Sequence, residues 1–197
     1  MQRTISNPVF WLTLAFNAWL IVYYTKHPEG FKTLLLLYWL QSLAIGFSTL
    51  VQLLALPTQP APGATKNSAL RYKGCQAGFF VMHYGIFHLV YLVFIVAGQK
   101  GAIDTRFLLL SAAILFLSEI LWLAKKLPPL VKTKANLGFI FFLPYLRIVP
   151  MHLILVGASV AGISNVTLFL VLKTMADLAM LVVGERLYSK ALQSVNQ

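Results

Sequence analysis

Ionisable side chains stand inside the long apolar segments of this sequence. His83 and His88 lie within the run FFVMHYGIFHLVYLVF, and His152 lies in a later apolar run. Lys173 and Asp177 are four residues apart in the last one. Ionisable groups inside a bilayer are costly, so they usually face the interior of a helical bundle, a partner or water. Each of these five residues is therefore a candidate functional residue.

Three of the candidates fall at a similar depth in their segments. At 1.5 Å per residue, His83 and Asp177 lie about 12 Å from the end of their segments that is richer in Lys and Arg, and His152 about 9–17 Å. Two imidazoles and a carboxylate suit Zn²⁺, with Fe or Mn as alternatives, and leave a position for water. The sequence predicts a metal site of His83, His152 and Asp177. A metal-dependent hydrolase acting on lipids is one function of such a site.

Two other residues are candidate catalytic groups. Glu119 lies about 9 Å from the same end of its segment and could serve as a base or proton carrier beside the metal. His88 follows His83 by five residues, which turns it about 140° round the helix. We therefore expect His88 to stack with Tyr84 and Tyr91 instead of binding the same metal, unless a π-bulge distorts the helix.

The same residues allow other functions. A hydrogen-bonded network across helices would fix the packing of a bundle without chemistry. Lys173 and Asp177, spaced i,i+4, would neutralise each other and could act as a charge switch in a proton- or cation-coupled transporter or channel. A non-catalytic partner subunit is a third alternative, and haem held by two histidines is less expected. Whether the protein is an enzyme stays open. The further polar residues expected to bond between helices are Gln41, Ser118, Tyr84 and Tyr91.

The composition indicates a membrane environment. Of the 197 residues, 59% are hydrophobic and 11% are charged, which is too apolar for a soluble domain of this size. The formal net charge of +11 comes mostly from Lys and Arg between the apolar runs, where anionic lipid headgroups attract them. Membrane lipids are thus the expected partners, and nucleic acid is not. The single cysteine, Cys75, excludes an intrachain disulfide.

Six apolar segments are long enough to cross about 30 Å of hydrocarbon. They cover residues 8–24, 33–56, 75–97, 106–125, 141–162 and 166–185. The sequence predicts an all-α integral membrane bundle of six transmembrane helices, forming one polytopic domain over the whole chain. Ten Lys and Arg residues fall on one side of the membrane and four on the other. This bias places both termini in the cytoplasm and the protein in the cell membrane as a multi-pass chain. The sequence leaves open whether copies associate into a homo-oligomer.

The fifth segment is the least regular. It holds Pro144, Arg147 and Pro150. Pro150 cannot donate a hydrogen bond to the carbonyl of Leu146. We expect the helix either to kink there or to begin only near Arg147, with residues 136–145 lying at the membrane interface.

Four stretches, YWLQSLAIGF, FFVMHYGIFH, YLRIVPMHL and LKTMADL, together resemble an uncharacterised family of small prokaryotic integral membrane proteins, a domain of unknown function. The resemblance runs from the second to the sixth segment. It carries His-Tyr-Gly, Pro-Met-His and Lys-Thr…Asp motifs. The matching positions are Gln41, His83, Tyr84, Gly85, Pro150, Met151, His152, Lys173, Thr174 and Asp177.

Two positions differ from that family pattern. Family members often have Glu where Gln41 stands and a further His where Tyr91 stands. If that His belongs to a family metal site, this protein would bind metal more weakly or differently. The resemblance implies a polar site in the membrane and no particular reaction.

A looser analogy is to seven-helix lipid amidases and adiponectin-type receptors, which hold zinc with three His and use Ser and Asp. Ser118, His83, His152 and Asp177 supply similar groups. Their spacing, order and helix number differ, so the analogy is one of chemistry and not of fold.

Overall fold

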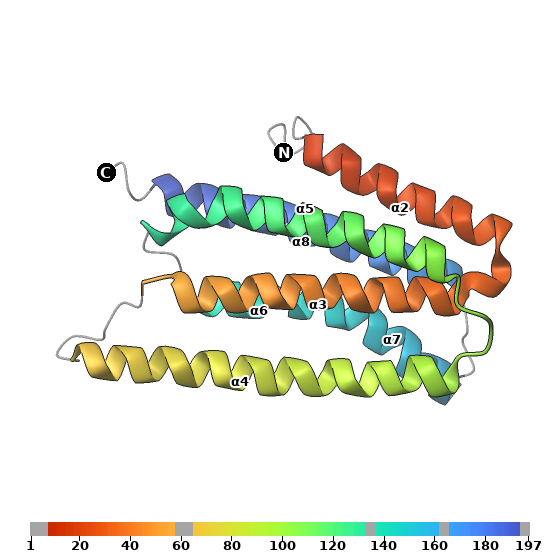
Figure 1. Cartoon of the computed structure of the whole chain (residues 1–197), viewed down its shortest axis with the longest axis horizontal. Helices are drawn as coiled ribbons and strands as arrows, with labels where there is room; N and C mark the ends of the chain where they lie inside the picture. The colour runs from red at the N-terminus through yellow and green to blue at the C-terminus, as the bar shows by residue number, and fades with distance from the viewer. Residues whose placement is uncertain (1–7, 58–64, 133–136, 162–165, 194–197) are drawn as a thin grey trace.

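A computed structural model describes residues 8–57, 65–132, 137–161 and 166–193, and these residues form helices and short connections with no strand among them. Figure 1 shows the helices running side by side along the longest axis. The helices in chain order are α2 (Pro8–Lys26), α3 (Phe31–Ala55), α4 (Lys66–Val93), α5 (Thr105–Val131), α6 (Leu137–Phe142), α7 (Tyr145–Ala161) and α8 (Val166–Gln193). A 3-10 turn (Pro28–Gly30) precedes α3, and a π-helical turn (Phe94–Gly98) follows α4.

Helices of membrane-spanning length dominate the chain. Among the described residues, α2, α3, α4, α5 and α8 contain stretches long and apolar enough to cross a membrane. These are five of the six predicted segments. The all-α architecture of a multi-pass membrane protein is confirmed at this level. For the predicted segment 141–162, the described apolar helical part is Ile140–Leu153, and the helix itself continues to Ala161.

The irregular fifth segment is divided between α6 and α7. The division lies at Leu143 and Pro144, where Arg147 N donates to Pro144 O in a turn (3.1 Å). A proline is tolerated there because the amide it lacks would have no partner at the start of a helix. α7 then begins at Tyr145 and continues through Pro150. The second of the two sequence alternatives, a helix that begins near Arg147, is therefore confirmed.

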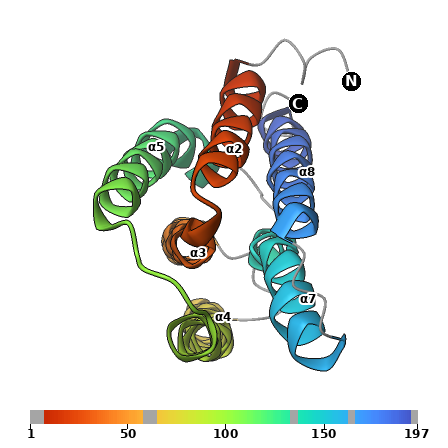
Figure 2. The same ribbon diagram turned by 90° about the vertical axis from the view of Figure 1, so that its right-hand side faces the viewer.

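α3 is the central helix of the bundle. In the end-on view of Figure 2 it lies with α2, α4, α5 and α7 around it. More than half of its most apolar stretch, 56%, is buried, compared with 17% for α2 and for α5. Leu35 and Tyr38 of its LLLLY run are fully enclosed. Its buried residues include the polar Ser42, Ser48 and Gln52, and polar side chains in a membrane bundle are placed away from lipid, which fits its central position.

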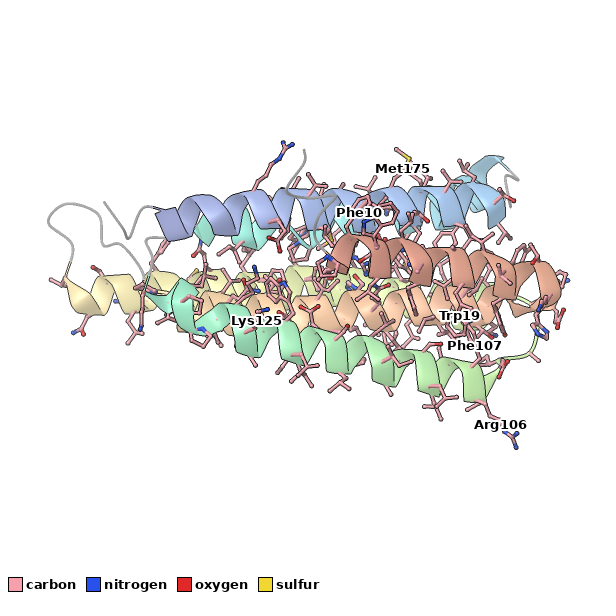
Figure 3. The ribbon with its side chains drawn as sticks, turned by 90° about the horizontal axis from the view of Figure 1, so that it is seen from above. Phe10, Trp19, Arg106, Phe107, Lys125 and Met175 are labelled. Atoms are coloured by element: carbon pink, nitrogen blue, oxygen red, sulfur yellow. The ribbon has the colours of Figure 1, made fainter. Side chains whose placement is uncertain are left out.

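Apolar side chains also cover the outside of the bundle. Met175 is 62% exposed and points away from α8 in Figure 3, and Leu110 on α5 is 68% exposed. On the α2–α5 side, the rings of Trp19 and Phe107 lie 4.9 Å apart (Figure 3). Apolar surface of this extent would be unfavourable in water and is suited to contact with lipid.

Polar contacts join the helices at both ends of the bundle. At one end Tyr23 OH donates to Asp104 Oδ2 (3.2 Å), and Asp104 N donates to Thr33 Oγ1 (3.0 Å). The other oxygen of Asp104 caps the first turn of α5. At the opposite end Lys126 of α5 pairs with Glu185 of α8 (3.5 Å). These contacts hold α2, α3, α5 and α8 around the interior that contains the candidate site.

Candidate functional site in the bundle core

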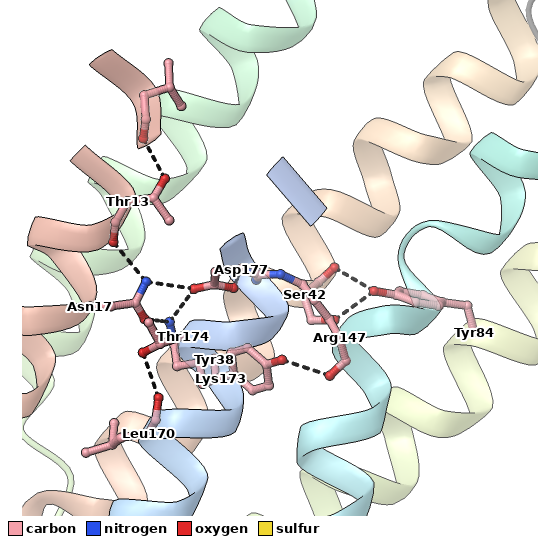
Figure 4. Close-up of polar contacts among 11 residues, drawn as sticks. Thr13, Asn17, Tyr38, Ser42, Tyr84, Arg147, Leu170, Lys173, Thr174 and Asp177 are labelled. Atoms are coloured by element: carbon pink, nitrogen blue, oxygen red, sulfur yellow. Dashed lines mark hydrogen bonds and ion pairs between the residues drawn. The ribbon is translucent and has the colours of Figure 1, made fainter. Parts of the chain in front are cut away.

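Four buried side chains from three helices meet in the core. The Asp177 carboxylate is their shared acceptor: Oδ2 accepts from Lys173 Nζ (2.8 Å) and from Asn17 Nδ2 (3.1 Å), and Oδ1 accepts from Arg147 Nη2. No more than 4% of any of these residues is exposed. Figure 4 shows them converging from α2, α7 and α8. We call Asn17, Arg147, Lys173 and Asp177 the charge cluster.

Local helix geometry brings these groups to one level. Lys173 and Asp177 are four residues apart and therefore share a face of α8. Asn17 is the central residue of α2, which packs against α8. Because α7 starts just after the break in the fifth segment, Arg147 lies in its first turn, and α7 also packs against α8. The charge cluster therefore depends on α8 having both α2 and α7 as neighbours.

Lys173 has two acceptors and two aromatic neighbours. Its Nζ donates to Asn17 Oδ1 (2.8 Å) as well as to Asp177 Oδ2. Nζ also lies 5.4 Å from the centre of the Tyr38 ring and 5.9 Å from that of Phe16. An ammonium has three N–H donors, and a neutral amine retains two. Both hydrogen bonds can therefore form whether or not the amine carries its extra proton.

Arg147 is only partly paired. Nη2 binds Asp177, whereas the buried Nε and Nη1 atoms have no hydrogen-bond acceptor among the described residues. The guanidinium carbon lies 5.3 Å from the centre of the Tyr38 ring, a cation–π contact. Tyr38 OH in turn donates to the backbone carbonyl of Arg147 (2.9 Å), which fixes the start of α7 on α3.

Positive charge exceeds negative charge in the charge cluster. Arg147 and Lys173 carry one positive charge each when protonated, and Asp177 is the single carboxylate bound to them. Glu119 of α5 is a further carboxylate that acts on the charge of Arg147, and it interacts with Ser48 of α3. The buried core therefore gains or loses one unit of charge when the Lys173 amine gains or loses a proton.

The polar core continues from the charge cluster towards α4. Tyr84 OH donates to the Ser42 carbonyl (2.9 Å) and lies 2.8 Å from its hydroxyl. His88 is 3% exposed, and its Nδ1 donates to the Tyr84 carbonyl (2.8 Å). The His88 and Tyr84 rings are in contact, with centres 4.1 Å apart and planes tilted by 33°, so His88 lies beside Tyr84 as the helical angle predicts. The π-helical turn lies at Phe94–Gly98, beyond both histidines, so it does not rotate His88 towards His83.

The structure does not bring His83, His152 and Asp177 together. His83 Nδ1 is 2.9 Å from Tyr145 OH, and His152 Nδ1 is 3.2 Å from Tyr91 OH. Both oxygens of Asp177 are occupied by the charge cluster. Among the described residues, no three His, Cys, Asp or Glu side chains lie close enough to hold a metal ion. The predicted metal-binding set, and the hydrolase based on it, are thus not supported by this geometry.

His83 and Asp177 stay apart because their helices lie at different positions across the bundle, although their depths along it are similar. α4, which carries His83, and α8, which carries Asp177, lie on different sides of the bundle with α3 and α7 between them (Figure 2). Equal distance along two helices does not make two residues neighbours.

The remaining predicted residues have separate positions. Ser118 is exposed, and its hydroxyl donates to Leu115 O of its own helix (2.8 Å). The side chain of Gln41 is half-buried, and its Oε1 has no partner among the described residues. Glu119 interacts with Ser48 instead of a histidine. Asn17 is the important residue that sequence analysis did not select, although an amide at the centre of an apolar segment was the available signal.

A separate cavity of about 310 Å³ opens between α4 and α6. It is lined mainly by aromatic rings, and no residue of the charge cluster contributes to it. The lining residues are Tyr72, Cys75, Gln76, Phe79, Phe141 and Phe142. The cavity and the charge cluster are therefore two distinct features.

A family of unknown function, DUF6498, matches residues 1–194, so the chain belongs to that family. This confirms the resemblance to an uncharacterised family, a domain of unknown function. No curated protein and no solved structure matches the chain. The chemistry of the charge cluster consequently has to be argued from its own residues.

Proposed function

We propose that this protein is a multi-pass membrane transporter in which the charge cluster is a proton-linked switch. The proton carrier is Lys173. Arginine stays protonated at any physiological pH, whereas a buried lysine can release its proton. The charge cluster then alternates between a state with one excess positive charge and a state with no net charge.

One observation carries this proposal: two cationic side chains and the carboxylate that binds both are buried where three helices meet. Ionisable groups inside membrane helices mark ion, proton or substrate pathways more often than structural contacts. Asp177 connects α8 to α7 through Arg147 and to α2 through Asn17. A change in the charge of Lys173 therefore alters the attraction that holds three helices together.

The transporter alternative is supported better than the lipid hydrolase. Hydrolysis needs an activated nucleophile beside the group that develops negative charge. His83 and His152 bond to tyrosines, His88 bonds to a backbone carbonyl, and Ser118 bonds to its own helix. In contrast, the charge cluster has the paired cations and carboxylate that a charge switch requires.

The proposal includes the orientation expected from the distribution of Lys and Arg. Both termini are then cytoplasmic, and the end of the bundle with the Lys126–Glu185 pair faces the cytoplasm. The end with Asp104 and Tyr23 faces outward. Under this arrangement the charge cluster lies between polar interhelical contacts at the two ends, where a transporter that admits its substrate from one side at a time would open and close.

Charge movement after a pH jump tests the proposal. Proteoliposomes adsorbed on a solid-supported membrane are stepped to lower pH, and the transient current is recorded. Protonation of Lys173 inside the membrane displaces charge, so the full chain should give a current that empty liposomes lack. Lys173→Met should abolish it, and Asp177→Asn should reduce it because the ammonium loses the negative charge that stabilises it.

Two further variants serve as controls. Lys126→Met removes a lysine at the end of the bundle and should retain the current. Lys173→Arg keeps a positive charge and hydrogen-bond donors at the site, and it should fold normally while giving no current. A wild-type current in Lys173→Arg would overturn the proposal.

A further inference from the structure

The unpaired guanidinium atoms of Arg147 point to a ligand. The residue is 3% exposed, so bulk water does not hydrate it. Only Nη2 has a hydrogen-bond acceptor among the described residues, and Nε and Nη1 have none. Buried donors without a partner are unfavourable, especially on a charged group inside a membrane. The contact with the Tyr38 ring compensates for part of the lost hydration and supplies no acceptor.

The charges around Arg147 indicate that the ligand is negatively charged. The Arg147 and Lys173 cations share one bound carboxylate, so the site attracts a further negative charge when Lys173 is protonated. Glu119 is the carboxylate that acts on Arg147 from α5, but no hydrogen bond joins it to Nε or Nη1. The negative charge of Glu119 therefore opposes the binding of a further anion without occupying these donors.

Geometry gives the class of the ligand. A guanidinium is planar and presents N–H groups in a fixed arrangement that matches the oxygens of a carboxylate or phosphate. Nε and Nη1 together carry three N–H donors. A cation would be repelled at this position, and a neutral solute would leave the excess charge unbalanced.

We infer that Arg147 and Lys173 form a binding site for a small oxyanion, a carboxylate or a phosphate. The inference rests on the proposed function for one point: Arg147 is enclosed in this structure, so the anion reaches it when the helices separate. Protonation of Lys173 adds the charge that attracts the anion, and this makes the oxyanion the solute whose binding is linked to the proton.

Equilibrium binding tests the inference without a membrane gradient. The full chain, purified in neutral detergent, is titrated with sodium acetate and with sodium phosphate while its thermal unfolding is followed by tryptophan fluorescence. Sodium chloride at equal ionic strength is the reference. Acetate, phosphate or both should raise the unfolding temperature saturably above that reference.

The matched variants identify Arg147 as the binding residue. Arg147→Lys keeps the charge and loses the planar donors, and the anion affinity should fall about tenfold or more. Arg106→Lys makes the same exchange at an exposed position in the first turn of α5 (Figure 3) and should leave the anion affinity unchanged. If Arg147→Lys does not fold, Glu119→Gln provides the test: removal of this negative charge, which opposes an anion, should tighten binding several-fold.

The results separate this inference from the proposed function. Unchanged anion affinity in Arg147→Lys would overturn the oxyanion site. If Arg147→Lys is unfolded, unchanged affinity in Glu119→Gln would do so. A rise in unfolding temperature no larger than that with chloride would also overturn it. The pH-jump current does not depend on either result. Saturable binding without that current would keep the oxyanion site and refute the proton switch.

A lipid headgroup is the second source of a phosphate. Nanodiscs of neutral lipid and of anionic lipid distinguish the two sources. Equal stabilisation by added phosphate or acetate in both kinds of nanodisc assigns the oxyanion to a free solute. Stabilisation by anionic lipid alone, lost in Arg147→Lys, assigns it to a headgroup and keeps Arg147 as the binding residue.

Discussion

Lys173 is the residue on which the proposed switch depends. Its two acceptors, Asn17 Oδ1 and Asp177 Oδ2, equal the number of N–H donors that a neutral amine retains. The local hydrogen bonds can thus persist while the charge changes by one. Arg147 cannot change in this way, because a guanidinium does not release its proton under physiological conditions. The structure therefore pairs one titratable cation with one permanent cation around a single carboxylate.

This arrangement predicts strong coupling between Lys173 and Asp177. Asp177→Asn removes the one carboxylate bound to both Arg147 and Lys173 and should lower the free energy of unfolding by about 3–5 kcal/mol. Adding Lys173→Met should recover part of the loss, because one of those cations is then absent. A double-mutant cycle measured by unfolding in mixed detergent micelles checks this. Simple additivity of the two substitutions would show that the pair is not coupled.

Sequence periodicity predicted some contacts of the core and not others. The i,i+4 spacing gave the Lys173–Asp177 pair, and the helical angle separated His88 from His83. Both follow from the geometry of a single helix. The contact of Asp177 with Arg147 depends instead on which helices are neighbours, and neither hydropathy nor residue spacing specifies that. For the same reason, a shared depth did not make the predicted metal ligands meet.

Among the elements, α3 positions the others. Tyr38 anchors the start of α7, and the Ser42 carbonyl and hydroxyl hold the phenol of Tyr84 on α4. Gly46, one turn further along α3, lies directly against the Tyr84 ring. Helices that pack through a glycine approach closely, which is a common device between membrane helices. The α3–α4 contact thus combines a small residue with a fixed aromatic side chain.

Gly46→Ala should consequently loosen the α3–α4 contact. A Cβ at this position would overlap Cε1 of Tyr84, and the hydrogen bonds to Ser42 prevent that ring from moving freely. We expect destabilisation of about 1–3 kcal/mol, typical of an overpacked interior. Thermal unfolding in detergent measures it.

Gly85→Ala is the matched control for that prediction. It lies on α4 next to Tyr84, and an added Cβ there has no heavy atom within 4 Å among the described residues. Alanine also favours the helix by about 0.8–1.0 kcal/mol relative to glycine. Gly85→Ala should therefore be neutral or slightly stabilising. Equal losses in the two variants would contradict the close packing of Gly46 on Tyr84.

At the scale of the whole molecule, charge is arranged in two ways. Most Lys and Arg residues lie between the apolar segments, where the positive-inside rule uses them to predict the orientation of the chain. Arg147 and Lys173 are inside the bundle, away from headgroups and solvent. In the proposal, the same residue types have two roles: an orienting role at the membrane surface and a switching role in the core.

The single cysteine tests the proposed orientation. Cys75 is exposed near the start of α4, at the end of the bundle assigned to the cytoplasm. A membrane-impermeant maleimide applied to intact cells should not label it, whereas labelling should appear after permeabilisation. Ala102→Cys in a Cys75→Ser background places the thiol in the exposed connection before α5 and should label without permeabilisation. The reverse pattern would place both termini on the outer side.

The protonation state of Lys173 is the most direct test of the switch. Lysine side-chain nitrogens labelled with ¹⁵N report by NMR whether each amine is neutral or charged, and the resonance absent from Lys173→Arg belongs to Lys173. In lipid nanodiscs, we predict that this resonance changes from the amine form to the ammonium form on acidification while the surface lysines remain ammonium. A Lys173 resonance that keeps one form across the pH range in which the protein stays folded would contradict the account.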